Sequence, residues 1–188
     1  YVTLVAKYED GHVVTGERLI PLYDQKIKSV FYDGNPSTNR DALEAIRHAD
    51  YIIFSMGSIY TSIMANVVLP ELRHELRKNT DAKKIYVSNV VTQPGESDGM
   101  SVNDLVTAIN NHVGIENYID QVFVTETKSL PKSLIKKYSD AKQELVKDDT
   151  DGKSYQTIHV DILDDRELEL IRHSDWKITN EARKLFNR

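Results

Sequence analysis

The 188-residue sequence contains no cysteine. Disulfide bonds and thiolate metal sites are therefore excluded for this chain. It also has no apolar run approaching the roughly 20 residues that a membrane-spanning helix requires, so we expect no membrane span. Because no signal-peptide pattern opens the sequence either, we expect a cytoplasmic protein.

Clustered positive charge is also lacking. The chain carries 24 Lys and Arg against 29 Asp and Glu, which gives a net charge of −5. Proteins that bind DNA or RNA concentrate Lys and Arg on one surface, so we expect no nucleic-acid partner, although a local basic pocket for a small anion stays open. With 40% hydrophobic and 28% charged residues the composition is that of an ordinary globular protein, and we expect a single domain over residues 1–188.

Two familiar kinds of chemical site are absent from the pattern. There is no Gly-Gly-Gly or Gly-x-Gly-x-x-Gly run, so the usual glycine-rich nucleotide loop is missing. None of the six histidines has the His-x-x-x-His spacing of a helical metal site. Five of them are therefore assigned surface or packing roles: His12, His48, His74, His112 and His159. No Ser–His–Asp or Cys–His nucleophile set can be argued.

Two polar loops follow apolar segments and organise the chain. The run from Tyr51 to Phe54 lacks alternation, as in a strand buried on both faces, and it leads into small Ser, Gly and Thr residues up to Ser62. The run 85–87 likewise leads into a polar loop, 89–99. Since ligands of open α/β sheets bind beyond the carboxyl ends of parallel strands, we expect two neighbouring loops that build one cleft. The alternative for the first loop is an ordinary strand-to-helix turn with Ser or Thr capping.

The remaining pattern alternates strands with helices. Further strands are predicted at 121–125, 154–162 and 168–172. Helices are predicted at 41–49, 66–78, 101–114, 131–138 and 175–186. This order predicts an α/β fold with three layers: a Rossmann-like, mostly parallel sheet with helices on both faces.

A small β-hairpin insert is predicted near the start of the chain. Asp10-Gly11 forms a hairpin-type turn between the β-rich runs 1–8 and 12–15, and another strand is predicted at 27–32. Three roles are open for this insert. It can flank the cleft, meet a partner subunit in a homo-oligomer, or cover the edge of the main sheet.

The second loop has the residue types of an anion or sugar site. Asn89, Thr92, Gln93 and the amides around Gly95 can hold phosphate or sugar hydroxyls.

The same loop carries two carboxylates, Glu96 and Asp98. They can coordinate Mg²⁺ beside a phosphate, because that ion commonly takes one or two carboxylates with phosphate oxygens and water. The alternative is that they order the loop by accepting backbone N–H bonds. The sequence does not decide between these roles.

At these residues the chain resembles a known family. The stretch from Gly57 to Ile63 with Asn66, and the block from Thr92 to Gly99, are similar to the CofD-like superfamily named for 2-phospho-L-lactate transferase. Within it the chain resembles the bacterial gluconeogenesis-factor, or YvcK-type, branch. The likeness continues through Tyr138 and through Arg172-His173.

The resemblance implies an incomplete family domain. Members of the superfamily open with a strand and a Gly-rich nucleotide loop, which this sequence lacks. We therefore expect the chain to correspond to the C-terminal two thirds of the family domain, with an N-terminal portion outside it.

The resemblance also implies a ligand. In the gluconeogenesis-factor branch, the positions that look like Tyr138 and Arg172 belong to a nucleotide-sugar site, with UDP-N-acetylglucosamine as the ligand. Arg172 suits a diphosphate, and Tyr138 suits stacking on a base or sugar. The expected ligand-binding residues are Gly57, Ser58, Tyr60, Thr61, Ser62, Asn66, Asn89, Thr92, Gln93, Gly95, Tyr138, Arg172 and His173.

Two functions follow from the resemblance. The first is a non-catalytic regulatory protein that binds a nucleotide sugar and is needed for cell shape and cell-wall homeostasis during gluconeogenic growth. The second is a transferase that moves a phospholactyl group to a deazaflavin alcohol, with Mg²⁺ and a guanine nucleotide. The transferase branch has a Ser-Asn-Pro type first loop, whereas this chain has Gly57-Ser58, so we favour the regulator.

Overall fold

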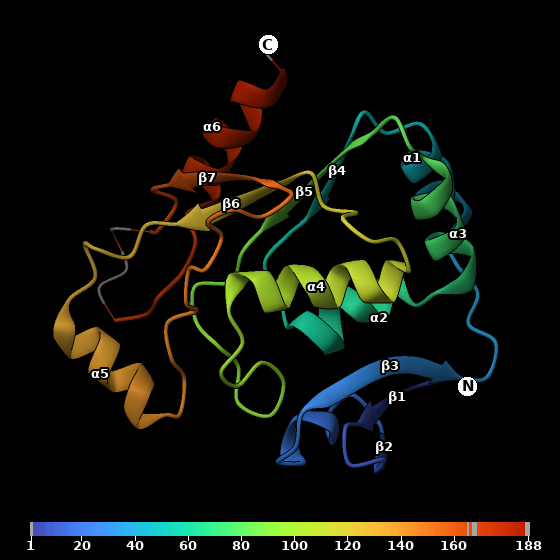
Figure 1. Cartoon of the computed structure of the whole chain (residues 1–188), viewed down its shortest axis with the longest axis horizontal. Coiled ribbons are helices and arrows are strands. Elements are labelled where there is room, and N and C mark those ends of the chain that lie inside the picture. Colours follow the sequence, from blue (N-terminus) through green and yellow to red (C-terminus); the bar gives the residue numbers. More distant parts are fainter. Residues whose placement is uncertain (1, 165, 167–168, 187–188) are drawn as a thin grey trace.

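The computed structural model describes residues 2–164, 166 and 169–186, which form two sheets and the helices around them (Figure 1). The larger sheet has four parallel strands in the order β4-β5-β6-β7. Their bounds are Tyr51–Phe54, Lys83–Val87, Gln121–Thr125 and Gln156–Val160. The predicted α/β fold with a mostly parallel sheet is thereby confirmed.

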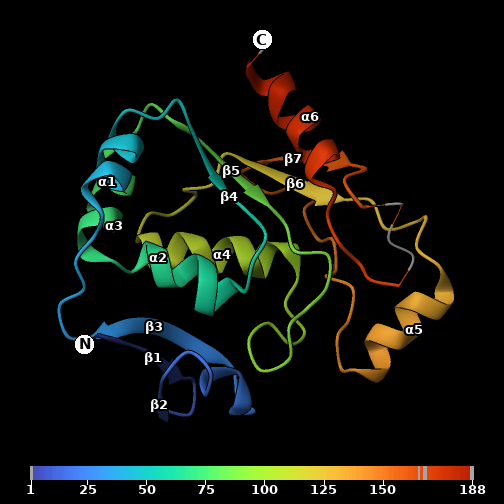
Figure 2. The same ribbon diagram turned by 180° about the vertical axis from the view of Figure 1, so that it is seen from behind.

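Helices connect and flank these strands. The α-helices have the following bounds: α1 Arg40–Arg47, α2 Ala65–Val67, α3 Pro70–Lys78, α4 Val102–Val113, α5 Lys132–Asp140 and α6 Asp175–Phe186. A 3₁₀ turn, η1, spans Ile20–Leu22, and a π-helical segment, η2, spans Ile59–Met64. Helix α5 lies beyond the carboxyl ends of the strands, at the far end of the molecule from α1 and α3 (Figure 2).

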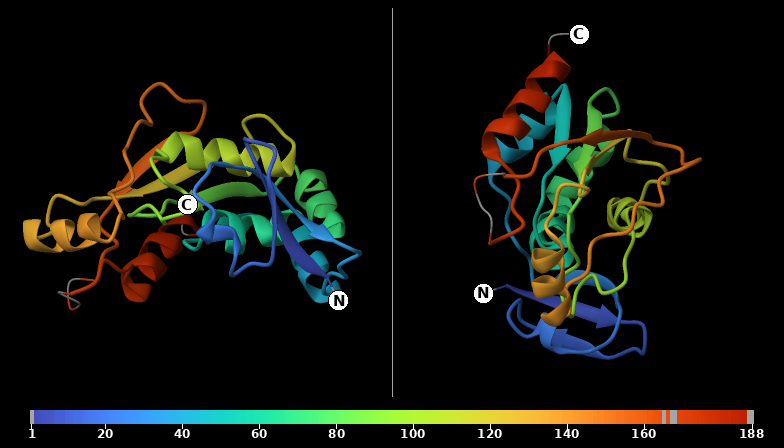
Figure 3. Two further views of the ribbon diagram at one scale, coloured as in Figure 1. Left: turned by 90° about the horizontal axis from the view of Figure 1, so that it is seen from below. Right: turned by 90° about the vertical axis from the view of Figure 1, so that its left-hand side faces the viewer.

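Helices α4 and α6 cover opposite faces of the parallel sheet (Figure 3). Successive residues of a strand point to opposite faces, and the buried clusters follow that alternation. One cluster joins strand residues to α4: Tyr86, Val122, Val124, Leu105 and Ile109. The other joins strand residues to α6: Ile85, Val87, Phe123 and Leu185. The expectation of helices on both faces is confirmed.

The predicted hairpin is part of a three-stranded antiparallel sheet with the order β2-β1-β3. The strands are β1 Thr3–Tyr8, β2 Val13–Thr15 and β3 Ile27–Asp33. Leu4, Ala6 and Tyr8 of the central strand are buried in the same core cluster as α4. The small sheet therefore covers that cluster on the side of α4 away from the parallel sheet (Figure 1).

The helix predicted over 66–78 is in fact two segments. Helical structure begins earlier, at Ile59, and breaks at Leu69, whose backbone is extended with φ −62° and ψ 120°. Pro70 then starts α3. Proline disfavours helical geometry in the residue before it but suits the first turn of a helix, which explains the break.

The strand predicted over 168–172 is wrong where the structure describes it. Residues 169–172 form no strand, and only His173 makes an isolated bridge, to Leu163; Leu168 lies outside the described residues. The predicted strand 154–162 shortens to β7, and the helix predicted over 101–114 is confirmed by a capping box of Ser101 with Asp104.

Candidate ligand site at the carboxyl edge of the sheet

The first and second loops lie side by side, as their parallel strands predict. Asn89 Nδ2 donates to the carbonyl of Gly57 at 2.9 Å, and its Oδ1 accepts from the Tyr86 hydroxyl at 2.8 Å. Ser58 Oγ donates to Gln93 Oε1 at 2.7 Å. These side chains are thus used to join the two loops to each other.

Glu96 is the centre of that junction. Its carboxylate is only 5% exposed and accepts the backbone N–H groups of Tyr60 and Thr61, both at 3.1 Å. It also accepts from Thr61 Oγ1 at 2.8 Å and from Gln93 Nε2 at 3.2 Å. Free N–H groups at the start of a helical segment favour a negative charge, so Glu96 caps η2 from a different loop. This geometry supports its role in ordering the loop.

Gly95 and Asp98 fix the tip of the second loop. Asp98 Oδ2 accepts from the backbone N–H of Gly95 at 2.6 Å, and the Asp98 side chain is exposed. Gly95 has φ +78°, and a Cβ atom there would lie 1.8 Å from the carbonyl oxygen of Pro21. Only glycine therefore lets the loop approach η1 so closely.

Metal binding by Glu96 and Asp98 stays a prediction. Across residues 2–164, 166 and 169–186, no group of three or more His, Asp or Glu side chains is placed to hold a metal ion. Both oxygens of Glu96 already accept from protein donors. Glu96 would have to give up these bonds to coordinate Mg²⁺.

Thr92 is buried and binds the chain rather than facing a cavity. Its backbone N–H donates to the carbonyl of Glu144 at 2.7 Å, and its Oγ1 accepts from the N–H of Glu144 at 2.9 Å. The N–H of Val146 donates to Val90 at 2.9 Å. The segment after α5 is thereby fastened along the second loop.

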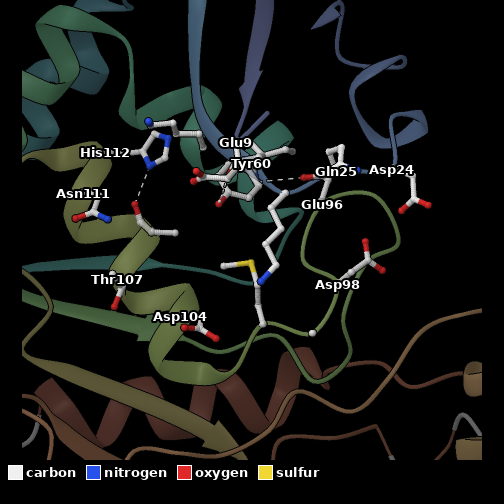
Figure 4. A pocket seen from close by; sticks show the side chains of 16 residues that line it. Glu9, Asp24, Gln25, Tyr60, Glu96, Asp98, Asp104, Thr107, Asn111 and His112 are labelled. Atoms are coloured by element: carbon white, nitrogen blue, oxygen red, sulfur yellow. Dashed lines mark hydrogen bonds between the residues drawn. The ribbon is translucent and has the colours of Figure 1, made fainter. Parts of the chain in front are cut away.

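A cavity of about 480 Å³ lies between the small sheet and α4 (Figure 4). It is lined by three of the expected site residues, Tyr60, Glu96 and Asp98. Burial, followed by the charges of Glu9 and Glu96, raises the pKa of Tyr60 to about 12, so its hydroxyl stays protonated and donates to the carbonyl of Ile27 at 3.1 Å. The small sheet does flank the loops, which is one of the roles expected for it.

A second cavity, of about 560 Å³, lies beside β4. Gly57, Ser62 and Asn66 line it together with mostly apolar residues. The side chain of Asn66 donates to the carbonyl of Ser62 at 2.9 Å, one turn earlier. The expected site residues therefore line different cavities.

Tyr138 and Arg172 are brought together by the fold. The Tyr138 hydroxyl accepts the backbone N–H of Ile171 at 2.9 Å, so α5 holds the residue before Arg172. Arg172 lines a cavity of about 270 Å³, and its guanidinium makes no hydrogen bond or ion pair within the part of the chain that the structure describes. An exposed, unpaired guanidinium on a held segment suits the recognition of an anionic group.

His173 ties the strand ends together. Its Nε2 lies 3.3 Å from Thr125 Oγ1 at the end of β6, and its ring also bonds to the backbone of Ser88 after β5. Burial lowers the pKa of His173 below its usual value, against the opposing effect of the bond to Ser88, so the neutral ring is favoured. His173 therefore positions the strand ends beside Arg172.

A further cavity, of about 490 Å³, opens where β5 and β6 end. Asn89 lines it, and so do Lys128 and Asp148, which the sequence analysis did not name, and His159, for which it predicted a surface or packing role. The signal for Lys128 was present, because a buried strand ending in Thr-Glu-Thr-Lys has the same form as the first two loops. The pairing of Asp148 with His159 is a long-range contact that no spacing shows.

Comparison with known proteins identifies relatives. The family model "2-phospho-L-lactate transferase CofD" matches residues 1–165. The chain is 36% identical over 188 residues to the gluconeogenesis factor of Bacillus subtilis, covering 95% of this chain and 56% of that protein. It is 34% identical over 191 residues to a putative gluconeogenesis factor of Aquifex aeolicus, covering 98% and 57%.

Solved structures agree with these matches. A crystal structure of a UPF0052 family protein from Bacillus halodurans aligns with a TM-score of 0.86 at 33% identity, covering 96% of this chain and 58% of that one. The chain thus spans slightly more than half the length of these relatives. No helix among the described residues is long and apolar enough to cross a membrane. From the family match and these relatives, the chain belongs to the CofD-like family of gluconeogenesis factors.

Proposed function

We propose that this protein is a regulatory protein that binds a nucleotide sugar, with UDP-N-acetylglucosamine as its ligand. The observation that carries the proposal is the guanidinium of Arg172, which is unpaired among the described residues, lines a cavity and sits on a segment held by Tyr138. A diphosphate offers the paired acceptor oxygens that a guanidinium binds best. The relatives named gluconeogenesis factor support the regulatory role.

Regulation by such a ligand requires two states of the protein with different affinities for it. The joined loops offer an element for this, because the Glu96 contacts connect the second loop to the start of η2. On this proposal, ligand occupancy at the carboxyl edge biases how the protein meets its partners. Cell shape and cell-wall balance during gluconeogenic growth are the proposed output, in the cytoplasm. A homo-oligomer formed through the small sheet is part of the same proposal.

A phospholactate transferase is the second candidate, because the family model that matches bears that name. Such an enzyme would bind a guanine nucleotide and a deazaflavin alcohol, with Mg²⁺ supplying charge neutralisation when bound. The contacts of Glu96 count against this candidate, since its oxygens are engaged with the chain itself.

The experiment is a calorimetric titration of the intact protein with UDP-N-acetylglucosamine, comparing wild type with Arg172→Ala. Loss of a charge-assisted contact should weaken binding by about 1.5–3 kcal/mol. Arg40→Ala is the matched control, because Arg40 is exposed at the start of α1, outside the cavity that Arg172 lines. Equal affinity of wild type and Arg172→Ala would remove Arg172 from the site.

A further inference from the structure

The cavity at the ends of β5 and β6 combines an apolar wall with polar groups that the protein leaves unused. Four valines contribute the wall: Val90, Val102, Val124 and Val146. The side chains of Glu126, Thr127 and Lys128 make no hydrogen bond or ion pair with any residue in the described ranges. A carboxylate, a hydroxyl and an ammonium group are thus available to a ligand.

His159 lines the same cavity in a fixed orientation. Its Nε2 lies 2.7 Å from Asp148 Oδ2. The other oxygen, Asp148 Oδ1, accepts from the backbone N–H and the hydroxyl of Thr150, at 3.1 and 2.7 Å. When the imidazole is neutral, a carboxylate held in this way favours the proton on Nε2, and Nδ1 is then a hydrogen-bond acceptor.

The charges of this cavity favour a neutral ligand group over an anionic one. Glu126 and Asp148 contribute two carboxylates against one ammonium group, Lys128. An anionic group would be repelled by the two carboxylates, whereas a neutral group with several hydroxyls can donate to Glu126 and His159 and accept from Lys128. The valine wall suits the C–H face of a sugar ring. At about 490 Å³ the cavity has the volume of an ordinary small-molecule site.

The cavity lies next to the cavity of Arg172, so one ligand with two parts could occupy both. Lys128 lines this cavity and the next residue, Ser129, lines the cavity of Arg172. A molecule with an anionic part and a neutral part can therefore reach both cavities across the segment 126–131.

We propose that the cavity between β5, β6 and His159 binds the sugar ring of the ligand, with His159 Nδ1 accepting a hydrogen bond from a sugar hydroxyl. This inference rests on the proposed nucleotide-sugar function. His159 is then a residue that determines specificity for the sugar, while Arg172 serves the diphosphate.

The test is a pair of calorimetric titrations on the intact protein, with UDP-N-acetylglucosamine and with UDP. His159→Ala should weaken the binding of UDP-N-acetylglucosamine about tenfold and leave UDP within about twofold, since only the sugar loses a hydrogen bond. His74→Ala, an exposed histidine on α3, is the control and should change neither. Glu126→Gln removes an exposed carboxylate with no partner among the described residues, so it should fold normally and weaken only the sugar nucleotide.

The inference would be overturned if the variants lost affinity equally for UDP-N-acetylglucosamine and UDP. It would also be overturned if neither His159→Ala nor Glu126→Gln lost affinity for UDP-N-acetylglucosamine. If wild type binds neither nucleotide, the proposed function fails, and the subsite is then decided by saturation-transfer NMR with free N-acetylglucosamine. Contacts seen with wild type and lost with His159→Ala would support the subsite by itself. The absence of contacts with wild type would reject it.

Discussion

At the scale of single residues, Glu96 connects the two loops most directly. It is a buried carboxylate whose four contacts come from the first loop, η2 and Gln93. A buried carboxylate is tolerated only where donors replace its water shell, and here the donors are supplied by backbone and side-chain groups of the same chain. The residue therefore holds the candidate site in shape.

Replacing Glu96 by Gln should destabilise the protein. The amide retains one acceptor oxygen but turns its NH₂ group toward N–H and O–H donors, so at least one buried donor is left unsatisfied. The expected loss is about 1–3 kcal/mol in the free energy of unfolding, measured by chemical denaturation. Glu116→Gln is the control, because Glu116 is exposed and pairs with no described residue. Identical unfolding curves for the two variants would contradict this role of Glu96.

His112 gives the small sheet a dependence on pH. Its Nδ1 lies 2.8 Å from the carbonyl of Ala108, and its Nε2 accepts the N–H of Val30 in β3 at 3.3 Å. Burial lowers the pKa of His112 below the usual 6.5, with Arg73 adding to the effect and the bond to Ala108 opposing it. The neutral ring is therefore the form that joins α4 to β3.

The sign of the pH effect follows from that shift. Above about pH 6.5 the His112 ring is neutral in both the folded and the unfolded state, and its contacts with Val30 and Ala108 are fully present. As the pH falls, the unfolded state gains a proton before the folded state does, so the free energy of unfolding declines. Half-buried His173, whose pKa is also lowered by burial, contributes in the same direction. Chemical denaturation at about pH 7.5 and 5.5 measures the free energy of unfolding at each pH. The decrease from the higher to the lower pH should be smaller for His112→Gln than for wild type. An equal loss in both proteins would refute this assignment.

At the scale of elements, the second loop is held against η1 by close backbone packing at Gly95. Two of its glycines, Gly95 and Gly99, have positive φ, at +78° and +66°. Only the first meets another part of the chain, because a Cβ atom at Gly99 would have nothing within 4 Å. The two positions therefore separate backbone strain from collision.

Gly99→Ala should destabilise the fold by about 1–2 kcal/mol, the cost of a left-handed backbone for alanine. Gly95→Ala should destabilise the fold clearly more than Gly99→Ala. Its Cβ would lie 1.8 Å from the carbonyl oxygen of Pro21, so the loop must move. Thermal unfolding of both variants measures the difference. A similar small loss for the two would show that the loop adjusts without leaving η1.

The helix break near Leu69 and the start of η2 show which helix boundaries local sequence patterns can predict and which they cannot. Pro70 marks the start of α3 in the sequence, yet the apolar spacing carried the predicted helix across it. The start of η2 at Ile59 could not be predicted for a different reason. Its first N–H groups are capped by Glu96, which comes 36 residues after Tyr60 in the sequence. A cap supplied from another loop leaves no signal in the local sequence.

At the scale of the whole molecule, the parallel pairing of β4 with β5 was predictable because buried strands followed by helices leave few alternatives. The proximity of the two loops followed from that pairing. The division of the expected residues among several cavities did not, because the loop side chains bond to one another instead of facing one opening. The contact of Tyr138 with Ile171 and the pairing of Asp148 with His159 depend on how α5 and β7 pack.

The most direct test of the central claim is a calorimetric titration of the intact protein with UDP-N-acetylglucosamine, run beside GDP with Mg²⁺. A nucleotide-sugar regulator should bind UDP-N-acetylglucosamine saturably, without turnover, and more tightly than GDP with Mg²⁺. Binding of GDP with Mg²⁺ and no response to the UDP-sugar would contradict the account and favour the transferase.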